Sequence, residues 1–521
     1  MDLNKGGVMN FRRCVTLLLG AATVLGHIGV AAAQNCDALK KLSLPGASVT
    51  GVEAVAAGAL TAGDVPKGTE KAVQAALAKL PAFCRVMISA KPGPGSDIRI
   101  EVWLPAAGWN GRLQAVGDGG LAGFIPFALM AQAMAGGYVT AGTDTGHVGA
   151  SVDFMPGNPD KLLDFAYRST HELAKAAKAV IAAHYGKPPR WSYYNACSGG
   201  GRHGITSAQR FPDDFDGIVA GAPSWNQARL DAARIGINLM VNRTPEHYIP
   251  ASKYPMVHRA VMQACDGLDG VVDGIIENPR ECRFDYAALL CKGADDGNCL
   301  TAPQVESAKM LTSPFHINGK LLLEPHLRPG SELQWATMAS PKPLPNSLAR
   351  VRHLHLKDTS WEFRIENIAD DVERAARMDD GLLASSNYNL KPFFDRGSKL
   401  ILWHGWSDPQ VPAEGSIIYY EGVRRTVGAA ADESMSLYML PGVLHCRGGP
   451  GADTFDRMAV ITDWVERGVK PARIVASRLS AGKVVSTRTI CPFPQTARYS
   501  GSGDPTDVAN FTCSGSTAAP R

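Results

Sequence analysis

The amino-acid sequence is informative first through what it lacks. None of its eleven cysteines is spaced as C-x-x-C, which argues against a zinc site. Positive and negative residues are nearly balanced, 53 Lys and Arg against 49 Asp and Glu, and no basic block indicates a nucleic-acid partner. Beyond the N-terminal segment no apolar run is long enough to cross a bilayer, and no internal repeat or low-complexity tract is present.

The first 33 residues have the pattern of a secretory signal peptide. Arg12 and Arg13 precede an apolar run over residues 15–30, and three small residues end it at Ala33. A membrane anchor is the alternative, but the run is short and ends in a small-residue cleavage site. We therefore expect cleavage after Ala33 and a secreted or periplasmic protein that is not held at the membrane. The export route stays open.

Ten cysteines remain in the mature chain, and an even number in an exported protein predicts five disulfides. Two close pairs invite local bridges, two further pairs would close the C-terminal tail and the N-terminal segment, and the last two cysteines are then left for each other. The local pairs are Cys265/Cys282 and Cys291/Cys299. Cys491/Cys513 would close the C-terminal tail and Cys36/Cys84 the N-terminal segment, which leaves Cys197/Cys446.

Strand and helix patterns alternate along most of the chain, which predicts an α/β fold with a mostly parallel, doubly wound sheet covered on both faces. Expected strands lie at 97–104, 112–116, 137–142, 191–195, 215–222, 398–404 and 436–440, and expected helices at 165–185, 201–210 and 454–468. From 223 to 392 strand signals are weak, and proline, charge and aromatic residues are scattered. We interpret 223–392 as an inserted lid domain within a catalytic domain formed by 34–222 and 393–521.

The stretch from Trp191 to Ala208 reads as a strand, a sharp turn and a helix, with Ser198 at the apex. Such a strained turn needs small residues two positions before and after the serine, and Ala196 and Gly200 meet that need. The amide of Gly199, at the start of the helix, would point at a developing oxyanion. The alternative is a glycine-rich turn that carries an ordinary serine.

A serine nucleophile needs a base, and the base needs an orienting carboxylate. Asp408 and His445 lie in loops after two consecutive expected strands, in the order Ser, Asp, His that a doubly wound hydrolase uses. Alone, Asp408 could be a turn residue before Pro409 and His445 a surface histidine. Cys197 and Cys446 add a link, because a bridge between them would tie the serine turn to the histidine loop; two buried thiols are the alternative.

Cys197-Ser198, Asp408 and His445-Cys446 resemble the signature of the tannase and feruloyl esterase family, which also contains the mono(2-hydroxyethyl) terephthalate hydrolases. The resemblance covers nearly the whole mature chain. It implies an α/β-hydrolase core with a lid, Ser198 as nucleophile, His445 as base and Asp408 as the orienting carboxylate. It further implies oxyanion donors at the amides of Gly119, in the glycine-rich loop 117–120, and of Gly199.

A second motif, residues 266–275, places three carboxylates at short spacing in a glycine-rich loop, where a hard cation such as Ca²⁺ would relieve their repulsion. The resemblance implies a structural lid calcium, with no organic cofactor. Its ligands would be the side chains of Asp266, Asp269 and Asp273 and the carbonyls of Val271 and Ile275. A solvated acidic turn is the alternative.

Aromatic residues and arginines mix at 350–364, which suits a lid that contacts an aromatic acyl group. Arg350, Trp361 and Phe363 are the substrate-binding candidates, and packing within the lid explains the same residues. We expect structural roles for His147, His203 and His404.

Together these features predict an exported serine carboxylesterase acting on small esters of aromatic acids, namely hydroxycinnamate, gallate or monoterephthalate esters. An acyltransferase on the same triad and a non-catalytic binding protein on a hydrolase scaffold are the rivals. The sequence leaves the oligomeric state and the preferred acyl group open.

Overall fold

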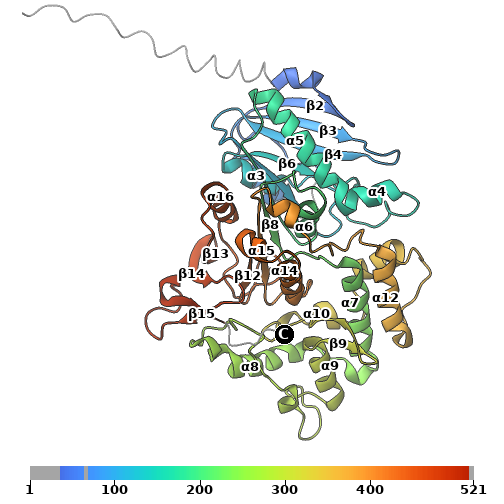
Figure 1. Cartoon of the computed structure of the whole chain (residues 1–521). Helices are drawn as coiled ribbons and strands as arrows, with labels where there is room; N and C mark the ends of the chain where they lie inside the picture. The colour runs from blue at the N-terminus through green and yellow to red at the C-terminus, as the bar shows by residue number, and fades with distance from the viewer. Residues whose placement is uncertain (1–35, 64–68, 516–521) are drawn as a thin grey trace, which may run out of the picture.

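A ten-stranded sheet forms the centre of the molecule in the computed structural model, which describes residues 36–63 and 69–515 (Figure 1). The predicted signal peptide lies outside these residues. Six strands run parallel, in the spatial order β6–β5–β7–β8–β11–β12. They are β5 (Arg112–Gly117), β6 (Val139–Thr143), β7 (Trp191–Cys197), β8 (Gly217–Gly221), β11 (Lys399–Gly405) and β12 (Met435–Leu440). Each corresponds to a strand expected from its apolar pattern.

The other end of the sheet is antiparallel and continues outward from β6. It contains β4 (Ile98–Pro105), β3 (Phe83–Ala90), β2 (Ala47–Val55) and β1 (Ser43–Leu44). Only β4 was predicted from the sequence.

Helices cover both faces of the sheet, as a doubly wound α/β fold requires. One face packs against α5 (Ser169–Tyr185), α6 (Gly199–Arg210) and α14 (Ala413–Val427). The opposite face packs against α2 (Glu70–Leu77), α3 (Phe127–Ala135) and α16 (Arg457–Arg467). Neighbouring residues Tyr193 and Tyr194 of β7 point to opposite cores because side chains alternate along a strand. The predicted fold class, an α/β-hydrolase core, is confirmed.

The segment between β8 and β11 leaves the sheet and returns to the neighbouring strand. It builds a core of its own around the fully buried Trp335, and Figure 1 shows it at one end of the sheet. Its elements are α7 (Gln227–Val241), α8 (Tyr254–Cys265), α9 (Ala302–Thr312), α10 (Ala336–Ala339), α11 (Pro345–Arg350), α12 (Ile368–Asp379) and the hairpin of β9 (Phe315–Ile317) and β10 (Lys320–Leu323). Within the described residues no helix is both long and apolar enough to cross a membrane.

After α16 the chain forms two antiparallel pairs, β13 (Ile474–Ser480) with β14 (Lys483–Ile490) and β15 (Thr496–Tyr499) with β16 (Phe511–Ser514). The sequence had suggested only a turn-rich tail. Arg488 of β14 contacts acidic residues of the segment between β8 and β11, which we call the insertion. This tail therefore connects the insertion to the sheet.

All five disulfides expected from the sequence are present: Cys36–Cys84, Cys197–Cys446, Cys265–Cys282, Cys291–Cys299 and Cys491–Cys513.

Candidate active site

Ser198 stands in a strained turn between β7 and α6. Its backbone has φ 63° and ψ −125°, a conformation that only a tight surrounding structure maintains. The turn is locked because the Ser198 amide donates to the carbonyl of Gly221 on β8 over 2.8 Å. A β-carbon at Gly201 would lie only 2.3 Å from that same carbonyl oxygen, so the glycine is required for the close approach of helix and strand.

The structure brings Ser198, His445 and Asp408 into one hydrogen-bonded chain. His445 Nε2 lies 2.8 Å from Ser198 Oγ, and His445 Nδ1 lies 2.6 Å from Asp408 Oδ2. Because the carboxylate can only accept, Nδ1 carries the proton and Nε2 is free to accept from the serine. The three residues therefore have the geometry that a serine nucleophile, a general base and an orienting carboxylate need.

Asp408 is fully buried but remains ionised. Burial raises the pKa of this carboxyl, but the neighbouring His445 and hydrogen bonds from His404 and His445 outweigh burial and hold the pKa well below its usual range. Its Oδ1 also accepts the amides of Gln410 at 2.7 Å and Val411 at 2.9 Å. The carboxylate thus keeps its charge and its orientation together.

Two backbone amides border the serine where an oxyanion would form. Gly199 begins α6, so its amide has no acceptor within the helix. Gly119 approaches so closely that a β-carbon there would lie 2.9 Å from the β-carbon of Ser198. The Gly119 amide, however, donates to Asp118 Oδ1 over 2.7 Å. The sequence pointed to the two glycines but not to the Asp118 carboxylate that accepts the amide of Gly119.

His147 and His203 contact backbone carbonyls rather than the triad. His147 lies 3.1 Å from the carbonyl of Leu121, just after the loop that carries Gly119, and His203 Nε2 lies 2.8 Å from the carbonyl of Phe165. His147 thus braces the loop after Gly119, and His203 ties α6 to the helical turn at residues 164–168.

The three substrate-binding candidates have contacts within the insertion. The Arg350 guanidinium donates to both oxygens of buried Asp231 over 2.7 and 2.6 Å, so these two donors are already occupied, and its contact with a substrate stays a prediction. Trp361 and Phe363 pack edge to face on each other and against the core of the insertion. Both side chains are only partly buried, so they contribute to the packing of the insertion, and their role in binding a substrate stays a prediction.

The acidic loop expected to bind calcium is rich in negative charge, and two of its aspartates, Asp266 and Asp269, are buried. Asp269, Asp273 and Glu277 all contact the single guanidinium of Arg488, at 2.8, 2.6 and 3.0 Å. The nearby Asp266 accepts backbone amides of the same loop. Burial raises the pKa of Asp269 to about 6 even though Arg488 opposes the increase. Arg498 adds a second guanidinium, which donates to the carbonyl of Leu268, so the carboxylates still outnumber the cations, and carboxylate oxygens are donors that suit Ca²⁺.

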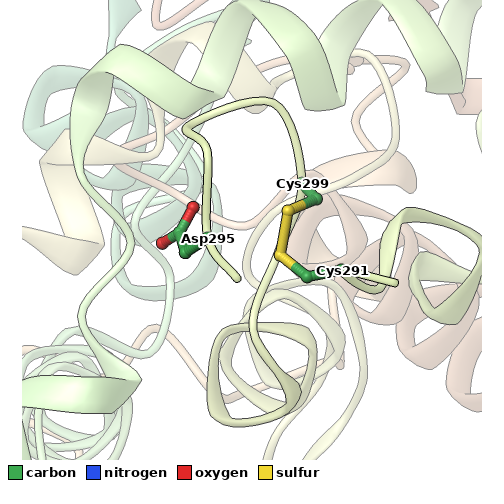
Figure 2. Close-up of side chains that lie close together, drawn as sticks. All are labelled: Cys291, Asp295 and Cys299. Atoms are coloured by element: carbon green, nitrogen blue, oxygen red, sulfur yellow. A yellow bond between two sulfur atoms is a disulfide. The ribbon is translucent and has the colours of Figure 1, made fainter. Parts of the chain in front are cut away.

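Another cluster of potential ligands does not offer a metal site. Cys291, Asp295 and Cys299 bring ligand atoms within 4.8 Å of one another (Figure 2). The two sulfurs are joined in a disulfide and cannot act as thiolates, and Asp295 binds Lys253 over 2.7 Å.

Comparison with known proteins gives consistent matches. The sequence model described as "Tannase and feruloyl esterase" matches residues 84–514. The chain is 34% identical to an uncharacterized esterase of Xanthomonas campestris, covering 95% of this chain and 94% of that protein. It is 32% identical to feruloyl esterase C of Talaromyces stipitatus, covering 95% and 98%.

Solved structures agree with these sequence matches. The crystal structure of feruloyl esterase B from Aspergillus oryzae superposes with a TM-score of 0.83 at 30% identity, covering 92% of this chain and 99% of that one. A tannin acyl hydrolase from Aspergillus niger shares the fold, with a TM-score of 0.74 at 23% identity and coverage of 92% and 94%.

Proposed function

This chain belongs to the tannase and feruloyl esterase family and is a carboxylic ester hydrolase, and we propose that it cleaves esters of aromatic carboxylic acids through a Ser198–His445–Asp408 triad. The observation that carries the proposal is the continuous hydrogen-bond chain of 2.8 and 2.6 Å from the serine hydroxyl to the buried carboxylate. The acyl group is a hydroxycinnamoyl, galloyl or monoterephthaloyl group.

In the proposed mechanism Ser198 Oγ attacks the ester carbonyl while His445 Nε2 takes its proton. Asp408 stabilises the imidazolium that forms, and the amides of Gly119 and Gly199 bind the oxyanion. For this, the Gly119 amide must exchange its bond to Asp118 for one to the substrate. His445 then protonates the leaving alcohol, and a water molecule, deprotonated by His445, releases the acid from the acyl-enzyme.

The acidic loop of the insertion is proposed to hold a structural Ca²⁺. Asp266, Asp269 and Asp273 would bind it through carboxylates, and Val271 and Ile275 through carbonyls. The ion would neutralise the charge that Arg488 leaves uncompensated. No catalytic step involves it.

Export from the cytoplasm is the third element of the proposal. Five disulfides support it, because such bonds form and persist in oxidising compartments.

Ser198→Ala tests the catalytic proposal against Ser207→Ala, a control on the same helix, with a chromogenic aryl ester. Turnover should disappear in the first variant and persist in the second; normal turnover in Ser198→Ala overturns the proposal. A fluorophosphonate should label Ser198, whereas absence of an adduct would favour a binding protein. Rates with methyl ferulate, methyl gallate and mono(2-hydroxyethyl) terephthalate then define the acyl group, and transfer to added alcohols would reveal an acyltransferase.

A further inference from the structure

A second histidine, His404, contacts the same carboxylate oxygen of Asp408 as His445 does. His404 lies on β11, four residues before Asp408, and is fully buried. Its Nε2 is 3.1 Å from Asp408 Oδ2 and 3.2 Å from the carbonyl of Val411. Its Nδ1 is 2.7 Å from the hydroxyl of Ser416, a fully buried residue of α14.

The partners of His404 define which nitrogen carries its proton. Nε2 faces two groups that only accept, the Asp408 carboxylate and the Val411 carbonyl, so Nε2 carries the proton and donates. Nδ1 then accepts the hydroxyl proton of Ser416. The result is a chain that reads Ser198, His445, Asp408, His404, Ser416, with a serine and a histidine on each side of one carboxylate.

This arrangement leaves Asp408 no freedom to rotate. Two backbone amides bind Oδ1, and the two imidazoles bind Oδ2. We infer that His404 and Ser416 are positioning residues of the triad, which hold Oδ2 toward His445 and share its negative charge. Neither residue touches the substrate, so both act only through Asp408.

The inference rests on the proposed triad but makes a distinct prediction. A histidine that only filled the core would affect stability, whereas a positioning residue affects the chemical step and the hydrogen bond between His445 and Asp408. That bond has its own signature, because the shared proton gives a far-downfield ¹H NMR signal whether or not the enzyme turns over.

His404→Leu removes the contacts to Asp408, to the Val411 carbonyl and to Ser416 while keeping an apolar side chain in the core. We expect kcat to fall about 10- to 100-fold with KM within about twofold, and the downfield signal to move. His404→Gln keeps an amide donor for Asp408 and should recover a large part of kcat. Ser416→Ala frees Nδ1 and should reduce kcat about three- to tenfold. Leu402→Ala, a fully buried residue on the same strand, should lower Tm but leave kcat and the signal unchanged.

Unchanged kcat and an unmoved signal in folded His404→Leu overturn the inference. If His404→Leu does not fold, the same outcome in Ser416→Ala overturns it. Recording the signal in a Ser198→Ala background separates the two proposals, because full turnover of Ser198→Ala removes the proposed function while the His445–Asp408 proton still reports on His404.

Discussion

Cys197 and Cys446 form a disulfide that joins the residue before Ser198 to the residue after His445, across 249 positions of sequence. Cys197 ends β7 and Cys446 lies in the loop after β12, and these two strands are separated in the sheet by β8 and β11. Hydrogen bonds between neighbouring strands therefore hold the serine and the histidine only indirectly. The disulfide connects the serine turn directly to the histidine loop. The backbone on each side of this link is in a conformation that is rare for residues other than glycine, since Ser198 and Cys446 both have a φ of 63°.

Replacing both cysteines, Cys197→Ser with Cys446→Ser, should reduce kcat by about tenfold, because the base is then less accurately placed against the nucleophile. It should also lower the free energy of unfolding by about 2–5 kcal/mol. The matched control removes Cys291–Cys299, which closes a loop of 8 residues in the insertion and should leave kcat unchanged. Steady-state kinetics and thermal melts test both; equal kcat in the two double variants contradicts the prediction.

If the Gly119 amide binds the oxyanion as proposed, Asp118 competes with the substrate for that amide. Its carboxylate accepts that amide over 2.7 Å and would repel a developing oxyanion. Asp118→Ala should therefore raise kcat/KM for a neutral ester about three- to tenfold, which corresponds to about 1 kcal/mol. Asp97→Ala, an exposed carboxylate elsewhere, is the control. A fall in kcat/KM would mean instead that the carboxylate keeps the amide correctly oriented.

The parallel strands could be predicted because their residues are buried on both faces and read as short apolar runs; β8, for example, is buried throughout. The turn at Ser198 was visible in Ala196 and Gly200. By contrast, β2 mixes exposed and partly buried residues, and its only fully buried residue is Val55. Its identity as a strand comes from pairing with β3, which local sequence does not reveal.

The same limit applies to side-chain partners. Arg350 in an aromatic segment resembles a ligand-binding arginine, and only the fold shows that Asp231, more than a hundred residues earlier, occupies its guanidinium. His404 lies four residues before Asp408 in the sequence, which hints that the two are neighbours. A histidine in a buried strand does not, however, by itself indicate a hydrogen bond to the triad. Nothing in the sequence around Ser416 indicates its contact with His404, because that contact depends on how α14 packs against the sheet.

Calcium should stabilise the insertion without taking part in the reaction. Chelation with EGTA should lower Tm by several degrees, and added Ca²⁺ should restore it, because the buried carboxylates then lose and regain their counterion. Asp266→Asn should abolish the Ca²⁺-dependent change in Tm, whereas Asp285→Asn, an exposed carboxylate of the insertion, should keep it. A Tm that does not respond to either EGTA or Ca²⁺ would remove the proposed ion.

Acid should destabilise the protein partly through His203. Burial and then the positive charge of Arg202 lower the pKa of this imidazole to about 3, whereas an unfolded histidine titrates near ~6.5. Between these values the unfolded chain binds a proton that the folded chain does not, so the free energy of unfolding decreases as the pH falls through this window. The contribution of His203 to the free energy of unfolding is fully present above pH ~6.5. Below that pH it falls by about 1 kcal/mol per pH unit until the folded pKa of about 3 is reached.

The measurement compares Tm at two pH values, about one unit above and two units below the unfolded pKa of histidine. His203→Gln keeps an amide donor for the Phe165 carbonyl but has no titrating group, so its Tm should decrease less on acidification than that of the wild type. Part of the wild-type decrease should remain, because burial and nearby Arg234 also lower the pKa of His326 to about 3. His316→Gln, an exposed histidine, should follow the wild type, and an equal decrease in both variants would show that His203 does not contribute.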